Sequence, residues 1–144
     1  MVMWRGGVMN QHYNQNYTSE QIAAVLATIQ HCIQNGKYVI SKNQNRQENI
    51  DFIYEYNLTI KRQKEILLRI RTEDFCHSLQ NTNVGFEFEV LYVFCPQVKL
   101  QSFQGKQEVL EIYIKFNLLH IQDGNRVVVI SFHKRNKPID YPFR

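Results

Sequence analysis

The sequence has no apolar run long enough to cross a membrane, and no apolar signal segment lies near its start. We therefore expect a cytoplasmic protein without a membrane partner. It has only three cysteines, an odd number without the spacing of a zinc site, which predicts buried thiols in a reducing compartment. Internal repeats and a dividing linker are also absent, so nothing indicates more than one folded domain.

The composition is typical of a globular protein: 144 residues, of which 44% are hydrophobic and 21% charged. A chain of this length can bury a core without a disulfide or structural metal. Residues 1–17 are rich in Asn, Gln and Tyr and show no apolar periodicity. We expect residues 1–17 to be a flexible leader and residues 18–144 to be a single domain.

Helical periodicity dominates the first half of the chain. A first helix is predicted to begin at Thr18 or Ser19, where Thr18 and Gln21 have capping-box spacing, and to end at Gly36. A short strand is expected at residues 37–40. Two further helices are predicted within residues 46–71, hinged near Asn57. The apolar residues expected to face inward from them are Ile50, Ile53, Tyr54, Ile60, Ile66, Leu67 and Ile70.

A short helix is also expected at residues 72–79. Thr72 can cap it, Glu73 and Asp74 suit its first turn, and Phe75 and Leu79 are four residues apart. This helix would carry His77 toward Glu89, which lies at the start of the next element.

The second half of the chain alternates between apolar and polar residues, which predicts strands at about residues 86–94, 109–119 and 126–133. Turns are expected at residues 101–107 and 123–125. Helices followed by a strand meander predict an α+β fold with N-terminal helices packed on one face of a small antiparallel sheet. The alternation places four polar residues together on the opposite face, which we expect to be exposed: Tyr113, Lys115, Ser131 and His133.

The net charge of +4 and the pI of about 9.0 favour a polyanionic partner without requiring one. The basic residues gather in two clusters, Lys61, Arg62, Lys64, Arg69 and Arg71, and then Lys134, Arg135 and Lys137. For the first cluster, a solvated helix face is the simplest interpretation.

Four short motifs follow one another in a characteristic order: Asp74-Phe75-Cys76-His77-Ser78, Phe88-Glu89-Val90-Leu91-Tyr92, Tyr113-Ile114-Lys115 and Ile130-Ser131-Phe132-His133. They resemble Asp-Phe-Tyr-Lys-Ser, Trp-Gln-Asp-Val-Tyr, Tyr-Leu-Lys and Val-Ser-Phe-Lys of the MqsR toxins, which have RelE-like ribonuclease folds. With Asn35-Gly36 after the first helix, the resemblance extends from about Val25 to His133.

The resemblance implies a RelE/MqsR-like fold and an mRNA-cleaving toxin that is neutralised by a cognate antitoxin, in a toxin–antitoxin hetero-oligomer. Tyr113 matches a functional tyrosine of the family. His77 and His133 stand where the family has functional lysines, and Glu89 stands where it has a glutamine.

Cutting RNA without a metal or other cofactor requires a base for the ribose 2′-OH, positive charge beside the phosphate and an acid for the leaving oxygen. We predict Glu89 or His77 as the base, His133 as the acid and Tyr113 as a donor to the phosphate; Glu87 could replace Glu89. Three cations would supply the positive field: Lys115, Lys134 and Arg135.

Two other functions remain open from the sequence: a non-catalytic RNA- or DNA-binding module that uses the same face, and a protein-interaction subunit. A zinc site is conceivable, but its four possible ligands lack the usual motif spacing: Cys76, His77, Cys95 and His133. Histidines and a glutamate favour the enzyme, because pure binders need Arg, Lys and aromatic residues rather than titrating groups.

Overall fold

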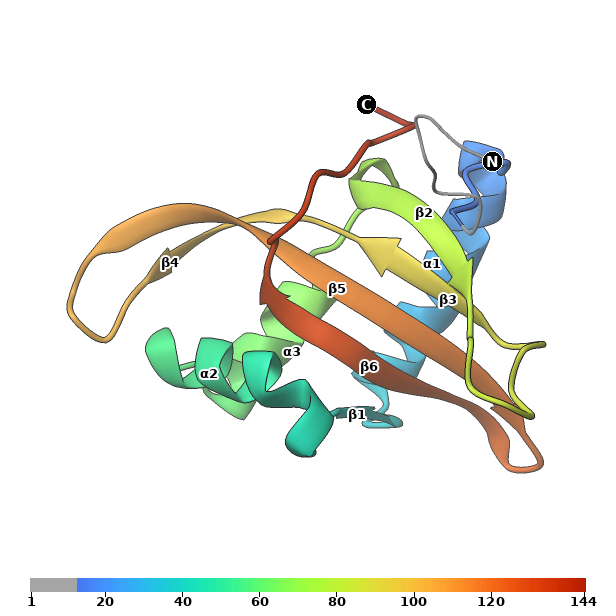
Figure 1. Ribbon diagram of the computed structural model, residues 1–144, viewed down its shortest axis with the longest axis horizontal. Coiled ribbons are helices and arrows are strands. Elements are labelled where there is room, and N and C mark those ends of the chain that lie inside the picture. The colour runs from blue at the N-terminus through green and yellow to red at the C-terminus, as the bar shows by residue number, and fades with distance from the viewer. Residues whose placement is uncertain (1–12) are drawn as a thin grey trace.

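The computed structural model describes residues 13–144, which form an α+β fold, as predicted (Figure 1). The helices are α1 (Ser19–Gln34), α2 (Gln47–Glu55) and α3 (Ile60–Leu68), with two 3-10 turns, η1 (Gln44–Arg46) and η2 (Thr72–Asp74). The strands are β1 (Tyr38–Ile40), β2 (Phe75–Gln80), β3 (Val90–Phe94), β4 (Gln97–Gln101), β5 (Gln107–Ile121) and β6 (Gly124–Lys134).

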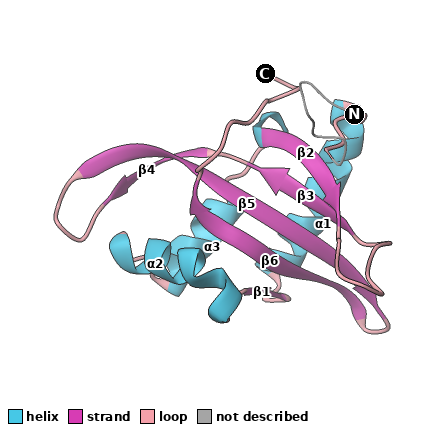
Figure 2. Ribbon diagram, in the orientation of Figure 1, coloured by secondary structure: helices cyan, strands magenta, loops and turns pink. Residues whose placement is uncertain are grey.

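The strands form one six-stranded sheet in the order β1-β6-β5-β3-β2, and β4 pairs with the first part of β5. All pairings are antiparallel except β1 with β6. The helices pack on one face, where α1 and α3 pass behind the long strands in Figures 1 and 2. Side chains from the helices and from this face of the sheet share one apolar core, which includes Ile29, Leu67, Phe94, Ile114 and Phe132.

The first helix forms as its sequence predicts. Thr18 accepts a hydrogen bond from the backbone of Gln21, and the Gln21 side chain accepts one from the backbone of Thr18. Its apolar stripe is buried, and Gly36 follows the helix with φ +72°, a left-handed conformation that favours glycine.

Helices α2 and α3 flank the predicted hinge at Asn57, which has φ +47°. The inward face predicted for α2 is only partly confirmed: the half-buried Ile53 packs against the core, but Ile50 is also half-buried and Tyr54 is 74% exposed. Asn49 and Phe52 are the buried residues of this helix. In α3 and after it, Ile66, Leu67 and Ile70 are buried as predicted, but Ile60, directly after the N-cap, is 75% exposed.

Asn49 explains how α2 is rotated. Strand β6 has a bulge near Ile130, where the register against β5 shifts by one residue. The Asn49 amide donates to the carbonyls of Ile130 and Ser41 and accepts from the Phe132 N–H. This buried amide satisfies backbone groups of β6 and of Ser41 beyond the end of β1, so Asn49, rather than an isoleucine, faces the sheet.

The helix predicted for residues 72–79 is also wrong. Thr72–Asp74 form only the 3-10 turn η2, and the chain then enters β2, where Phe75–Ser78 are all buried. The helix-start signals are local, whereas pairing with β3 decides the conformation of these buried residues. His77 therefore lies on a strand.

The predicted strand at residues 86–94 begins only at Val90. Gly85 has φ +90°, and hydrogen bonds from Phe86 N to Asn83 O and from Glu89 N to Phe86 O make turns there instead. The predicted strands 109–119 and 126–133 lie within β5 and β6, whose two-residue turn, residues 122–123, is slightly earlier than expected. Strand β4 was not predicted.

The sheet face away from the helices is not open, so this part of the prediction is wrong. Tyr113 and Ser131 are each only 3% exposed. The chain after β6 folds back so that Ile139 and Tyr141 pack against Val93 and other residues of this face. Alternation shows which residues share a face, but it does not show which segment covers them.

The expected flexible leader contributes to the same cover. Its residues 1–12 lie outside the described residues, but residues 13–17 lie against β2. Asn14 and Ser78 exchange backbone hydrogen bonds, and the hydroxyls of Tyr17 and Ser78 are 2.7 Å apart.

Candidate functional site

The four predicted catalytic residues all project from the sheet face opposite the helices, but they are spread over it. Tyr113 pairs with His133, whereas His77 pairs with Val93, which in turn pairs with Lys115. Strands β2 and β6 are separated by three strand spacings of roughly 4.8 Å, so the backbones of His77 and His133 are about 14 Å apart. The structure therefore brings Tyr113 and His133 together but keeps His77 at a distance.

Tyr113 and His133 are stacked, with ring centroids 5.5 Å apart and planes inclined by 19°. The Nδ1 atom of His133 lies 2.8 Å from the carbonyl oxygen of Lys134. Since a carbonyl only accepts, we infer that Nδ1 carries a proton and that Nε2 is the acceptor in the neutral ring. Glu48 lies 3.8 Å from Nδ1 and can stabilise the protonated ring. His133 is thus oriented for proton transfer through Nε2.

His77 is 2% exposed and stacks on Tyr13, with ring centroids 3.9 Å apart. Burial, followed by the positive charges of Lys137 and Lys115, lowers the pKa of His77 to about 4. The ring is therefore neutral at pH 7, and its Nε2 atom has no hydrogen-bond partner among the described residues. It borders a cavity of about 350 Å³ that Tyr13, Gln15 and the turn 138–140 also line.

Glu89 lies apart from both histidines. Its Oε1 atom accepts hydrogen bonds of 3.0 Å from the side chains of Asn81 and Asn117. It precedes Val93, the partner of His77, by four residues, which corresponds to about 13 Å along the strand direction. These two amides supply hydrogen-bond donors to the Glu89 carboxylate at the base of the β2–β3 loop. Glu87, the predicted substitute, lies within that exposed loop.

Three cations gather near Tyr113 and His133: Arg46, Lys115 and Lys137. Burial, followed by repulsion from Arg46 and Lys137, lowers the pKa of Lys115. The Lys137 ammonium lies 4.9 Å from the centre of the Tyr113 ring. Burial opposes the charged form of Lys137, but the neighbouring phenols Tyr113 and Tyr13 outweigh it, so the pKa of Lys137 is raised. In residues 13–144, none of these three cations has an ion pair within 4 Å.

The other two predicted RNA-binding cations are engaged in ion pairs. Lys134 lies 3.1 Å from Glu55, and Arg135 lies 2.8 Å from Glu111. Sequence reasoning placed Lys137 in the basic tail but did not identify Arg46 or Tyr13 as site residues. Neither carried a signal, because their places depend on how η1 and the segment before α1 lie against the sheet.

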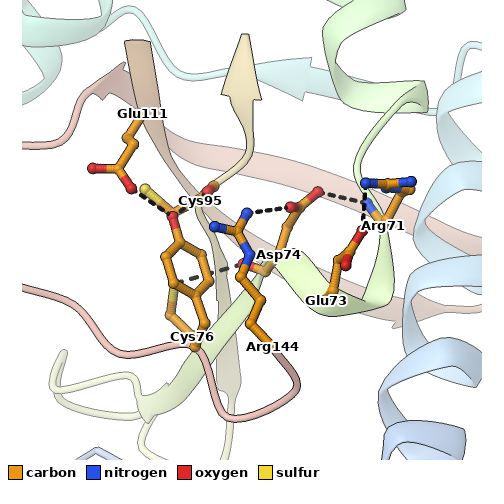
Figure 3. Close-up of polar contacts among 8 residues, drawn as sticks. Arg71, Glu73, Asp74, Cys76, Cys95, Glu111 and Arg144 are labelled. Atoms are coloured by element: carbon orange, nitrogen blue, oxygen red, sulfur yellow. Dashed lines mark hydrogen bonds and ion pairs between the residues drawn. The ribbon is translucent and has the colours of Figure 1, made fainter. Parts of the chain in front are cut away.

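The segment that covers this face is held by polar contacts at its end (Figure 3). The Tyr141 hydroxyl lies within hydrogen-bond distance of the Cys95 carbonyl and the Glu111 carboxylate, at 2.6 and 3.0 Å. Arg144 donates to Asp74 at 2.9 Å and stacks on the Tyr141 ring. These contacts hold residues 137–140 beside His77 and Tyr113.

The thiols beneath this segment are buried, as predicted. A hydrogen bond with Cys95, and then burial, raises the pKa of Cys76, so the Cys76 thiol keeps its proton. Across the described part of the chain, no group of three or more His, Cys, Asp or Glu side chains is arranged to hold a metal ion.

Two general findings complete the description. No helix within residues 13–144 combines the length and apolar character needed to span a membrane. Comparison of the chain with protein-family models, with curated proteins and with solved structures found no match.

Proposed function

We propose that the protein is a metal-independent endoribonuclease that holds RNA beside Tyr113 and His133. The observation that carries this proposal is the stacked Tyr113–His133 pair next to three cations that have no acidic partner within residues 13–144. Cations beside an imidazole suit a phosphodiester, because they stabilise the charge that develops on its oxygens during cleavage.

The chemistry needs two proton-transfer groups. In this proposal, His133 exchanges a proton through Nε2, and Lys115 is the second group because its pKa is lowered. Lys115 pairs with Ser131, two residues from His133, so the two are diagonal neighbours about 7–8 Å apart. Arg46 and Lys137 neutralise the phosphate. His77 and Glu89 lie too far from His133 to act on the same phosphodiester in this structure.

Cleavage of RNA in the presence of EDTA tests the proposal. The wild type should produce 2′,3′-cyclic phosphate ends, and His133→Ala should lower the rate by on the order of 10²–10⁴. His120→Ala is the matched control: His120 is an exposed histidine near the β5–β6 turn and should keep full activity. Intact RNA after prolonged incubation with the wild type would contradict the proposed enzyme.

The resemblance to MqsR toxins, with a RelE-like fold, extends the proposal to a cytoplasmic toxin with a cognate antitoxin. Phe86 and Phe88 in the β2–β3 loop are 51% and 75% exposed, and exposed aromatic groups of this kind suit a protein partner. Expression without the antitoxin should stop growth, and His133→Ala should relieve the arrest. Normal growth at high expression of the wild type would argue against a toxin.

A non-catalytic RNA-binding module is the second candidate. It is favoured by the burial of His77 and by the two amides that hold Glu89, which leave His133 as the one predicted proton-transfer residue beside the cations. Tight binding of RNA that remains intact, weakened by Lys115→Gln and unchanged by His133→Ala, would support this candidate.

A further inference from the structure

A second cavity, of about 350 Å³, lies away from Tyr113 and His133, between α3, η2 and the start of β4. Five cationic side chains and one carboxylate line it, together with apolar side chains that include Ile66, Pro96 and Val98. The six charged residues are Arg62, Arg69, Arg71, Lys99, Arg144 and Asp74.

The single carboxylate is already neutralised. Asp74 is 5% exposed, and its Oδ1 atom accepts a hydrogen bond of 2.9 Å from Arg144. Its Oδ2 atom accepts one of 2.8 Å from the backbone N–H of Arg71 (Figure 3). The ring of Tyr141 stacks on the Arg144 guanidinium, 3.7 Å away, so this group is fixed at the edge of the cavity.

The cations that line the cavity outnumber the carboxylates near them. Arg62 has Glu65 as a partner at 3.6 Å, and Arg71 pairs with Glu73. Arg69 and Lys99 form no ion pair within 4 Å in the part of the chain that the structure describes. A solvated helix face, the simple interpretation of the basic cluster, does not explain why cations from α3, the segment that follows it, β4 and residue 144 meet around one cavity.

We propose that this cavity binds the phosphoryl groups of a nucleotide-sized ligand. Guanidinium groups match phosphate oxygens with paired N–H donors. Arg69 and Lys99 add positive charge beside three arginines that already have acidic partners, and this excess favours a multiply charged group over a single carboxylate. The volume suits a small ligand. The apolar side chains provide a surface for its uncharged part. The phosphoryl groups can belong to a free nucleotide or to the phosphorylated end of an RNA.

Calorimetric titrations of the full chain test this proposal with four probes. These are inorganic triphosphate, ATP, and a short 2′-O-methyl RNA, which cannot be cleaved through its 2′ position, with either a 5′-triphosphate or a 5′-hydroxyl. The double variant Arg69→Gln/Lys99→Gln changes two exposed side chains and should weaken triphosphate binding at least about tenfold. ATP binding identifies a free nucleotide. Tighter binding of the 5′-triphosphate RNA than of the 5′-hydroxyl RNA, with the difference lost in the double variant, identifies an RNA end.

A matched control separates the cavity from general electrostatics. Lys61→Gln/Lys106→Gln removes the same charge from exposed positions outside the cavity and should leave the affinity unchanged. His133→Ala should also bind normally, so this test is independent of ribonuclease activity. The proposal is overturned if no phosphate probe binds the wild type, if both double variants weaken binding equally, or if a glutamate-rich peptide binds as tightly as triphosphate.

Discussion

The two faces of the sheet differ in whether their buried polar groups have hydrogen-bond partners. The face toward the helices is apolar, and two amides buried on its side have partners: Asn49 for its donor and acceptor groups, and Gln63, which donates to the Leu58 carbonyl. The opposite face buries the His77 Nε2 atom and the Tyr113 hydroxyl without any partner in the described residues. Buried polar groups are nearly always satisfied, so the two atoms without a partner support the proposal that this face holds a ligand.

Replacing Asn49 should have the largest effect. Asn49→Ala would leave the Phe132 N–H and the carbonyls of Ile130 and Ser41 unpaired, which should lower the free energy of unfolding by about 3 kcal/mol. The comparison is Asn117→Ala on the other face, which removes one hydrogen bond to Glu89 and should cost about 1 kcal/mol. Urea denaturation measures both. Equal losses would mean that the two faces do not differ in this way.

Lowering the pH should have the second-largest effect on stability, through His77 on the sheet face opposite the helices. The pKa of His77 is lowered to about 4, below its usual 6.5, so at pH values between these the unfolded chain binds a proton that the folded chain does not. Stability from His77 is therefore complete above pH 6.5 and is lost as the pH falls toward 4. This contribution should be about 2 kcal/mol smaller at pH 5 than at pH 7.5.

The variant His77→Gln isolates this effect, because it removes the titrating ring. Its free energy of unfolding is measured with urea at pH 5 and at pH 7.5. The loss between these two pH values should be about 2 kcal/mol smaller in His77→Gln than in the wild type. If the two proteins lose stability in parallel, His77 is not a buried neutral imidazole.

The contrast between the faces also explains what the sequence could predict. Thr18, Gln21 and Gly36 mark the first helix by local contacts alone, and the short turn between β5 and β6 holds Tyr113 opposite His133. Such features depend on neighbours in the sequence or on one hairpin register.

Long-range contacts set the rest of the site. The rotation of α2 depends on hydrogen bonds to the backbone of β6, such as the one from Asn49 to the Ile130 carbonyl, some eighty residues away. Residues 72–79 carry helix-start signals that pairing with β3 overrides. Tyr13 and Lys137 lie in segments without periodicity, so no pattern in the sequence indicated that they cover His77 and Tyr113.

Removing the Tyr113 hydroxyl should have the smallest effect on stability and is the sharpest test of the comparison. Tyr113 is 3% exposed and its hydroxyl has no hydrogen-bond partner among the described residues, so Tyr113→Phe should change the free energy of unfolding by less than about 0.5 kcal/mol.

Tyr56 is the matched tyrosine beneath the helices: it is 4% exposed and donates to Glu108 at 3.0 Å. Tyr56→Phe should therefore cost about 1–2 kcal/mol. RNA cleavage and RNA affinity should show the reverse order, with a loss in Tyr113→Phe and none in Tyr56→Phe, because the Tyr113 hydroxyl is the predicted donor to the phosphate. Suppose instead that Tyr113→Phe destabilises the protein as much as Tyr56→Phe and leaves RNA binding intact. The Tyr113 hydroxyl then has a structural role, and the two faces of the sheet do not differ in how they bury polar groups.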